Sequence, residues 1–257
     1  MKNDKSKPLI VITGASAGIG AATARRFAKE GFRLALTARR LDRLEELQKE
    51  LKENISIYEL DVRSSDEVGT VFKHIEKEQG LIEILVNNAG CGFGLEPAHQ
   101  CKIEEWDQCI DTNIKGLLYC TRAALPSMVQ INKGHIINLG SVAASYPYPG
   151  GNVYGGTKAF VHQFSLNLRA DLLGTKVRVS CIEPGLVGGT EFSVVRFRGD
   201  ETRASKVYEH AQSLNPEDIA EVIYFCHALP PHVNINTVEL MPVCQASGPL
   251  SIHRTSS

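Results

Sequence analysis

Short apolar runs alternate with longer segments of helical periodicity along almost the whole chain. The runs are rich in Ile, Val and Leu, and most are apolar at successive positions, which is typical of strands covered on both faces of a sheet. They predict seven strands, at residues 9–13, 33–38, 55–61, 82–87, 135–139, 177–182 and 236–241.

The segments between these runs repeat apolar side chains at helical spacing. In one of them Leu41, Leu44, Leu47 and Leu51 form an apolar stripe among charged residues, as expected of a helix with one packed face. Because strands and helices alternate, right-handed crossovers into one parallel sheet follow, and we expect an α/β fold in a single domain over residues 1–257. Helices are predicted at residues 19–30, 41–52, 66–79, 103–128, 152–173 and 216–229.

The stretch from residue 190 to residue 210 departs from this regularity. It is polar, contains Arg196, Arg198, Arg203 and Lys206, and has no strand pattern. We expect a lid or a substrate-binding loop there.

Composition and charge exclude several classes of protein. A net charge of −1 and a pI near 6.7 give no reason to expect nucleic acid or an anionic membrane as a partner. No stretch approaches the roughly 20 apolar residues of a membrane span, and the lysine-rich start of the chain has no secretory apolar segment. The seven cysteines lack the C-x-x-C spacing of metal sites, which favours free thiols, no metal centre and a reducing, cytoplasmic location.

A glycine-rich loop follows the first predicted strand and opens the first predicted helix. Glycines allow the backbone to turn tightly and to approach a pyrophosphate, and a helix N-terminus offers free N–H groups. The alternative is a tight turn that binds nothing. As a nucleotide site, the loop would act through Gly14, Ala15, Ser16, Ala17, Gly18 and Ile19.

The end of the second predicted strand indicates which nicotinamide cofactor is used. Folds that bind NAD place a carboxylate there, whereas this chain has Arg39 and Arg40. Guanidinium groups suit a 2′-phosphate, so NADP is favoured, although the two arginines also fit the start of a solvated helix. Asp61, after the third strand, fits either an adenine contact, with Val62 beside it, or a helix cap.

Tyr154 and Lys158 are one helical turn apart, so both side chains can face one pocket. A cation about 5 Å from a phenol favours the phenolate by roughly 3 kcal/mol, or about 2 pK units, at an effective dielectric near 20. That shift would bring a tyrosine, with its ordinary pKa of about 10, into the range of acid–base catalysis. A surface pair on an amphipathic helix is the alternative.

Together with further motifs, these residues resemble the short-chain dehydrogenase/reductase family. The further motifs are Asn87-Asn88-Ala89-Gly90 after the fourth strand, Asn113, Ser141 and Pro184-Gly185, so that the resemblance spans nearly the whole chain. It implies a doubly wound, Rossmann-type sheet of seven strands in the order 3-2-1-4-5-6-7. It also implies NAD(P)-dependent oxidoreduction of an alcohol or a carbonyl.

The chain is more closely similar to the bacterial NADP-dependent 3-hydroxy acid dehydrogenases, through residues 96–99, 150–154, 182–192 and 232–236. This branch implies a homotetramer. It also implies oxidation of serine, L-allo-threonine and acids such as 3-hydroxyisobutyrate, with reduction of malonic semialdehyde in the other direction. A broad-specificity carbonyl reductase or a 3-oxoacyl reductase is the alternative enzyme, and a non-catalytic NADPH sensor or scaffold is the alternative from another class.

The resemblance implies a role for each residue of the site. Tyr154 would be the acid–base group, Lys158 would lower its pKa and bind the nicotinamide ribose, and Ser141 would bind the substrate oxygen. Asn113 would hold a water molecule in a proton relay. By pattern alone, Ser141 also fits a turn, and Asn113 fits a helix surface. The remaining implied cofactor contacts are Asn88 on the adenosine side and, around the nicotinamide and the pyrophosphate, Pro184, Gly185, Leu186, Val187, Thr190 and Phe192.

A 3-hydroxy acid carries a carboxylate, so a cation should meet it. Arg196 and Arg198 are the candidates for this substrate contact, although loop arginines are more often solvated. The polar tail over residues 243–257 would either wrap a neighbouring subunit or fray.

Overall fold

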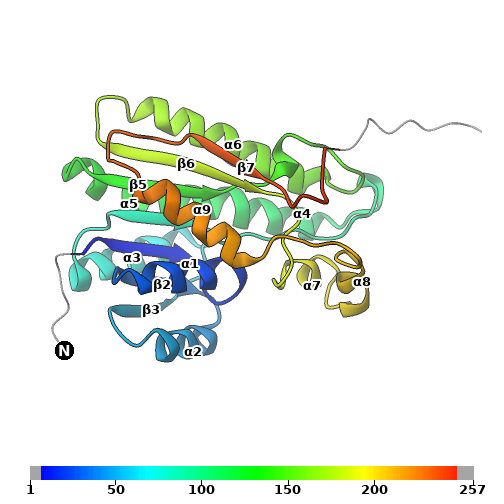
Figure 1. Cartoon of the computed structure of the whole chain (residues 1–257), viewed down its shortest axis with the longest axis horizontal. Coiled ribbons are helices and arrows are strands. Elements are labelled where there is room, and N and C mark those ends of the chain that lie inside the picture. The colour runs from blue at the N-terminus through cyan, green and yellow to red at the C-terminus, as the bar shows by residue number, and fades with distance from the viewer. Residues whose placement is uncertain (1–6, 248–257) are drawn as a thin grey trace, which may run out of the picture.

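A computed structural model describes residues 7–247 and places seven strands in one sheet (Figure 1). Every neighbouring pair is parallel, and the order is β3-β2-β1-β4-β5-β6-β7. This confirms the expected α/β fold and its strand order. The strands are β1 (Leu9–Thr13), β2 (Arg33–Ala38), β3 (Ile55–Glu59), β4 (Ile84–Asn87), β5 (Gly134–Leu139), β6 (Val177–Pro184) and β7 (Thr237–Leu240).

Helices cover both faces of the sheet. Helices α1 (Gly18–Lys29), α2 (Leu41–Leu51) and α9 (Pro216–Ala228) pack on one face, and α1 and α9 lie in front of the sheet in Figure 1. Helices α3 (Ser65–Gln79), α5 (Leu117–Gln130) and α6 (Asn152–Asp171) pack on the other. No helix within residues 7–247 combines the length and the apolar character that a membrane span requires.

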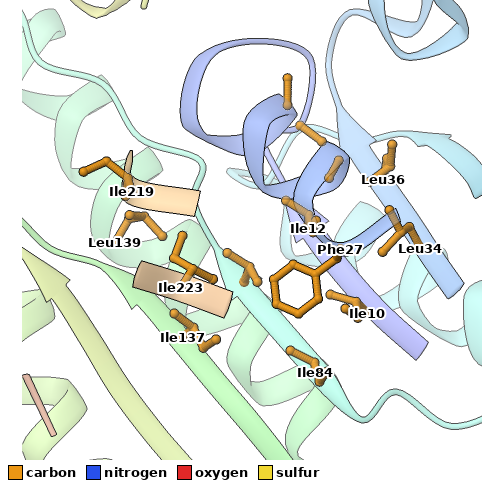
Figure 2. Packing of buried hydrophobic residues seen from close by; sticks show 14 of the residues in the cluster. Ile10, Ile12, Phe27, Leu34, Leu36, Ile84, Ile137, Leu139, Ile219 and Ile223 are labelled. Carbon is orange, nitrogen blue, oxygen red and sulfur yellow. The ribbon is translucent and has the colours of Figure 1, made fainter. Parts of the chain in front are cut away.

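The core divides into two layers because successive strand residues point to opposite faces. Ile10 and Ile12 of β1 pack with Phe27 of α1 and Ile223 of α9, as Figure 2 shows. Their neighbour Val11 belongs to the layer beneath α3 and α5. All five residues of β1 are buried, which explains why this strand has no polar face in the sequence.

The helix expected over residues 103–128 is interrupted. Helix α4 (Ile103–Ile110) passes into a π-helical turn, η2 (Asp111–Gly116), before α5 begins. The wider turn brings Asn113 inward, where its side chain bonds to the backbone of Cys91. A side chain at Gly116 would meet Val62 Cγ2 at 2.7 Å, so the turn also packs tightly against the loop after β3.

The segment over residues 190–210 contains two short helices, α7 (Phe192–Arg196) and α8 (Glu201–Lys206), and no strand. Both lie beyond the carboxyl ends of the strands (Figure 1, yellow). Two 3₁₀ turns, η1 (Ala98–Gln100) and η3 (Val142–Ala144), lie in loops at the same end. Of the polar tail, residues 248–257 are outside the described part of the chain.

Candidate active site

A cavity of about 1340 Å³ opens where the strands end. This exceeds the roughly 300–1,000 Å³ of an ordinary small-molecule pocket, so it has room for a dinucleotide with a substrate beside it. Loops after β1, β2, β3, β4, β5 and β6 line it, and α7 closes one side. Open α/β sheets bind their ligands at this edge.

The glycine-rich loop forms one wall of the cavity. Gly14 has a φ of +66°, and a Cβ there would lie 2.9 Å from Ala89 Cα, so no larger residue fits. A Cβ on Gly20 would overlap the carbonyl oxygen of Gly14. Helix α1 begins after Ala17 without a side-chain cap. Its first N–H groups are therefore left for an anion, and the loop fits a pyrophosphate.

Asn88 lines the cavity and also fixes the shape of this loop. Its Nδ2 donates to the carbonyl oxygens of Thr13 at 2.9 Å and of Gly14 at 3.1 Å. Thr13 Oγ1 in turn accepts from the backbone N–H groups of Asn88 and Ala89. The amide of Asn88 therefore holds β1 to β4, a role that its position in the sequence did not reveal.

Arg39 and Arg40 line the far end of the cavity, after β2. Arg40 forms a forked ion pair with Glu191, with distances of 2.6 and 3.0 Å, and also donates to Ser16 Oγ at 3.2 Å. The Arg40 guanidinium lowers the pKa of the Glu191 carboxyl. The two residues are 151 positions apart, so no local pattern indicated that Glu191 belongs to this site.

Asp61 and Val62 line the cavity beside the arginines. The Asp61 carboxylate accepts from Arg63 Nε at 2.9 Å and from Nη2 at 2.6 Å, and Arg63 lowers the pKa of Asp61. The cap of the next helix, α3, is Ser64, whose side chain accepts from Glu67 N. The alternative in which Asp61 caps that helix is therefore wrong.

Tyr154, Lys158 and Ser141 all line the cavity. The side chain of Ser141 lies near enough to Tyr154 to favour ionisation of its phenol. Lys158 is 7% exposed, and its Nζ donates to the carbonyl of Leu139 at 2.7 Å and lies 5.9 Å from the centre of the Tyr154 ring. The helical spacing of Tyr154 and Lys158 does bring both side chains to one pocket, so the surface-pair alternative is wrong.

The electrostatics of Tyr154 differ from the expectation. Burial raises the pKa of its phenol, although Ser141 and the charge of Arg196 oppose the shift. Burial also lowers the pKa of Lys158. The predicted lowering of the Tyr154 pKa by Lys158 is therefore wrong for this structure. The ammonium is bound to a carbonyl, and desolvation of the phenol outweighs the nearby cations.

Asn113 is 2% exposed, and both the oxygen and the nitrogen of its side-chain amide form hydrogen bonds. Its Oδ1 accepts from Cys91 N at 2.9 Å, and its Nδ2 donates to Cys91 O at 2.8 Å and to Thr157 Oγ1 at 3.0 Å. Because Asn113 is buried, the alternative that its side chain lies on the surface of a helix is wrong. Because these bonds use the side chain, the structure gives it a positioning role for the loop after β4.

The two candidate substrate arginines are placed differently. Arg196 lines the cavity, with its guanidinium 4.9 Å from the centre of the Tyr154 ring and Nη2 donating to Tyr148 Oη at 3.1 Å. Its Nε is buried, and it has no hydrogen-bond partner within residues 7–247.

Arg198 does not line the cavity. It binds Glu96 at 2.9 Å and Glu105 at 2.5 and 2.8 Å, and it lowers the pKa of Glu96 to about 2. The interpretation of Arg198 as a substrate contact is corrected, because two carboxylates already occupy its guanidinium. It joins the end of α7 to α4.

The end of β6 and the segment after it also line the cavity. Leu186 N donates to the side chain of Gln245 at 2.7 Å, so a residue near the end of the described chain also contributes to this wall. The expected contacts that line the cavity here are Pro184, Gly185, Leu186, Val187, Thr190 and Phe192.

One group of potential metal donors is found within residues 7–247. The donor atoms of His162, Cys181 and Glu183 lie within 4.8 Å of one another. His162 Nδ1 and Glu183 Oε1 are hydrogen-bonded at 2.7 Å. That bond satisfies the buried Glu183 carboxylate without an ion.

Comparison with known proteins agrees with this geometry. Residues 8–200 match the short chain dehydrogenase family. The chain belongs to this family. That confirms the resemblance drawn from the motifs.

Several relatives are similar over their whole length. The NADP-dependent 3-hydroxy acid dehydrogenase YdfG of Salmonella typhi is 56% identical, over 96% of this chain and 100% of that protein. Sulfoacetaldehyde reductase 2 of Chromohalobacter salexigens is 44% identical, over 96% and 98%. A solved closed form of serine dehydrogenase complexed with NADP+ is 54% identical, covers 96% of this chain and 100% of that one, and has a TM-score of 0.95.

Proposed function

We propose that this chain is an NADP-dependent dehydrogenase that oxidises 3-hydroxy acids such as serine, L-allo-threonine and 3-hydroxyisobutyrate. In the other direction it reduces semialdehydes such as malonic semialdehyde. One observation carries the proposal. Ser141, Tyr154 and Lys158 line one cavity, with Arg196 over the Tyr154 ring, in a chain more than half identical to 3-hydroxy acid dehydrogenases.

The cavity supports NADP as the cofactor. The glycine loop and the uncapped start of α1 would bind the pyrophosphate, and Arg39 and Arg40 would bind the 2′-phosphate once Arg40 releases Glu191. When bound, NADP+ supplies the hydride acceptor and a positive charge near Tyr154. The segment over residues 190–210 would act as the lid over this assembly.

Four side chains of the cavity and its surroundings have separate roles in the proposed reaction. Ser141 would orient the substrate hydroxyl, and Tyr154 would take its proton during oxidation and return it during reduction. Lys158 would bind the nicotinamide ribose and stabilise the phenolate. Asn113 would hold the loop that carries Gly90 and Cys91 against these groups.

Arg196 would bind the substrate carboxylate. Its guanidinium lies over the Tyr154 ring, and its buried Nε has no hydrogen-bond partner within the described residues, so a carboxylate there would complete its hydrogen bonding. Such a contact holds the other end of the acid while the hydroxyl lies at Tyr154. Because the carboxylate is at a fixed distance from the hydroxyl, this contact would select 3-hydroxy acids over longer or neutral alcohols.

Replacing Arg196 with Ala is expected to lower kcat/KM for 3-hydroxyisobutyrate by about tenfold to fiftyfold. That range corresponds to the roughly 1.5–2.5 kcal/mol of a charge-assisted hydrogen bond. Steady-state kinetics at saturating NADP measure it. Arg203→Ala, which removes a cation from the same segment but outside the cavity, is the matched control and should stay within about threefold. Equal effects of both substitutions would contradict the carboxylate contact.

The two directions of the reaction should respond differently to pH. Oxidation needs the Tyr154 phenolate, and burial raises the pKa of this group, so kcat/KM for 3-hydroxyisobutyrate should rise towards tenfold per pH unit below that pKa. Reduction needs the phenol, which the raised pKa preserves. Semialdehyde reduction should therefore stay flat between about pH 6 and 9. A reduction rate that falls through this range would contradict the assignment of Tyr154.

A substrate screen followed by NADPH absorbance tests the function itself. Serine, L-allo-threonine and 3-hydroxyisobutyrate should be oxidised with a higher kcat/KM than any neutral secondary alcohol. Malonic semialdehyde should be reduced faster than an acetoacetyl thioester or sulfoacetaldehyde. A preference for the thioester would favour a 3-oxoacyl reductase, and tight NADPH binding without turnover would favour a sensor.

Assembly and location belong to the same proposal. We expect a homotetramer in the cytoplasm, because the chain is similar along its whole length to the bacterial 3-hydroxy acid dehydrogenases. Size-exclusion chromatography with light scattering measures the mass directly, and a monomer of 28.1 kDa would contradict the tetramer.

A further inference from the structure

Two cysteines meet beside the candidate active site. Cys91 follows Gly90 after β4 and lines the cavity, whereas Cys109 belongs to α4 and is 2% exposed. Cys109 Sγ donates to Cys91 O at 3.5 Å, and Cys91 Sγ donates to the carbonyl of Gln108, the residue before Cys109, at 3.7 Å. All seven cysteines are free thiols, so both of these sulfurs are available for oxidation.

The surroundings of the two thiols are unequal. The neighbouring Cys109 thiol, with smaller effects from the charges of Lys158 and Arg39, lowers the pKa of the Cys91 thiol, although burial opposes this shift. The neighbouring Cys91 and burial raise the pKa of the Cys109 thiol. Charge therefore develops on the sulfur that faces the cavity, while its partner stays protonated.

We propose that Cys91 is an oxidation site for hydrogen peroxide that enters the cavity, with Cys109 as the thiol that resolves the product into a disulfide. The Cys91 thiolate attacks one peroxide oxygen, the O–O bond breaks and hydroxide leaves, giving a sulfenic acid at Cys91. Cys109 then attacks that sulfur as the S–O bond breaks. The Cys109 proton and the departing hydroxide form water, and the S–S bond remains.

Disulfide formation would disturb the catalytic groups through Asn113. Its Nδ2 donates to Cys109 Sγ at 3.3 Å and to Cys91 O at 2.8 Å, so both cysteines contact the same amide. A Cβ on Gly90 would lie 3.3 Å from Asn113 Oδ1 and 3.6 Å from Lys158 Nζ. A disulfide that draws α4 and the loop after β4 together would therefore move Gly90 and Asn113, and Gly90 lies close to Lys158.

The test treats the wild-type protein with hydrogen peroxide in the absence of reductant. Peptide mass spectrometry under non-reducing conditions should show Cys91 linked to Cys109. Semialdehyde reduction should fall at least tenfold and return after dithiothreitol. Saturating NADP should slow both changes, because it fills the cavity. Absence of the linked peptide from treated, ligand-free protein would overturn the proposal.

Single variants assign the two roles, each compared with its own untreated activity. Cys91→Ser should lose activity at least tenfold more slowly than wild type. Cys109→Ser should retain a sulfenic acid at residue 91, which dimedone labels. Cys244→Ser removes an exposed thiol that has no thiol partner and should behave as wild type. If Cys91→Ser is inactivated at the wild-type rate, the proposal fails. The cross-link is measured by mass alone, so this result is independent of the proposed substrate.

Discussion

Replacing Tyr154 with Phe is expected to lower kcat for 3-hydroxyisobutyrate oxidation by about 10²–10⁴-fold, the usual contribution of a general acid–base group. The ring itself should keep its packing against Phe192, with centroids 5.4 Å apart, and its place beneath Arg196. The loss should therefore fall on kcat rather than on NADPH affinity. Single-turnover rates and NADPH fluorescence titration separate the two quantities.

Tyr58→Phe is the matched control for this substitution. It removes the same hydroxyl from an edge strand, where Tyr58 Oη donates to Glu78 at 3.1 Å, outside the cavity. We expect kcat within about twofold of wild type for this variant. If Tyr154→Phe also keeps kcat within that range, the tyrosine is not the acid–base group, and the mechanism proposed for this site is wrong.

The double substitution of Arg39 and Arg40 by Ala is expected to weaken NADP binding about 100-fold. Two exposed charge-assisted contacts to a phosphate, at roughly 1.5 kcal/mol each, give this value. NAD has a hydroxyl in place of that phosphate, so its dissociation constant should change less than threefold. Isothermal titration with both dinucleotides measures the ratio, and equal weakening of both would contradict a 2′-phosphate site.

Glu191→Ala is expected to strengthen NADP binding at the same site. Arg40 and Glu191 are 44% and 50% exposed, so their ion pair contributes only about 0–1 kcal/mol. Removing the carboxylate frees Arg40 and takes a negative charge away from the phosphate. NADP should then bind more tightly, by up to about fivefold. Weaker binding would mean that Glu191 itself contacts the cofactor.

The sequence was sufficient for the features that depend on local pattern. Continuous apolar strands and intervening amphipathic helices predicted the parallel sheet, because strands covered on both faces cannot carry a polar side. The same holds for the glycine loop, where Gly14 and Gly20 allow contacts that no side chain would permit. Tyr154 and Lys158 could be paired because helical spacing fixes which residues share a face.

Features that depend on long-range contacts were missed or misread. Arg196 and Arg198 look alike in the sequence, and only the positions of Glu96 and Glu105 decide that Arg198 is held outside the cavity. The pKa of Tyr154 was misread for a related reason, because burial of the phenol outweighs the opposing effects of Ser141 and Arg196. Burial depends on the whole fold and cannot be read from one helix.

The inward position of Asn113 depends on the number of residues in the π-helical turn η2. The turn has one residue more than an α-helical path over the same rise would need, and this extra residue lets Asn113 face inward between α4 and α5. Deleting any one of residues 111–116 would remove the extra residue and close the wide turn to α-helical pitch, so Asn113 would lose the geometry that lets it face inward. Natural variation there should consist of replacements rather than insertions or deletions, even at its exposed positions.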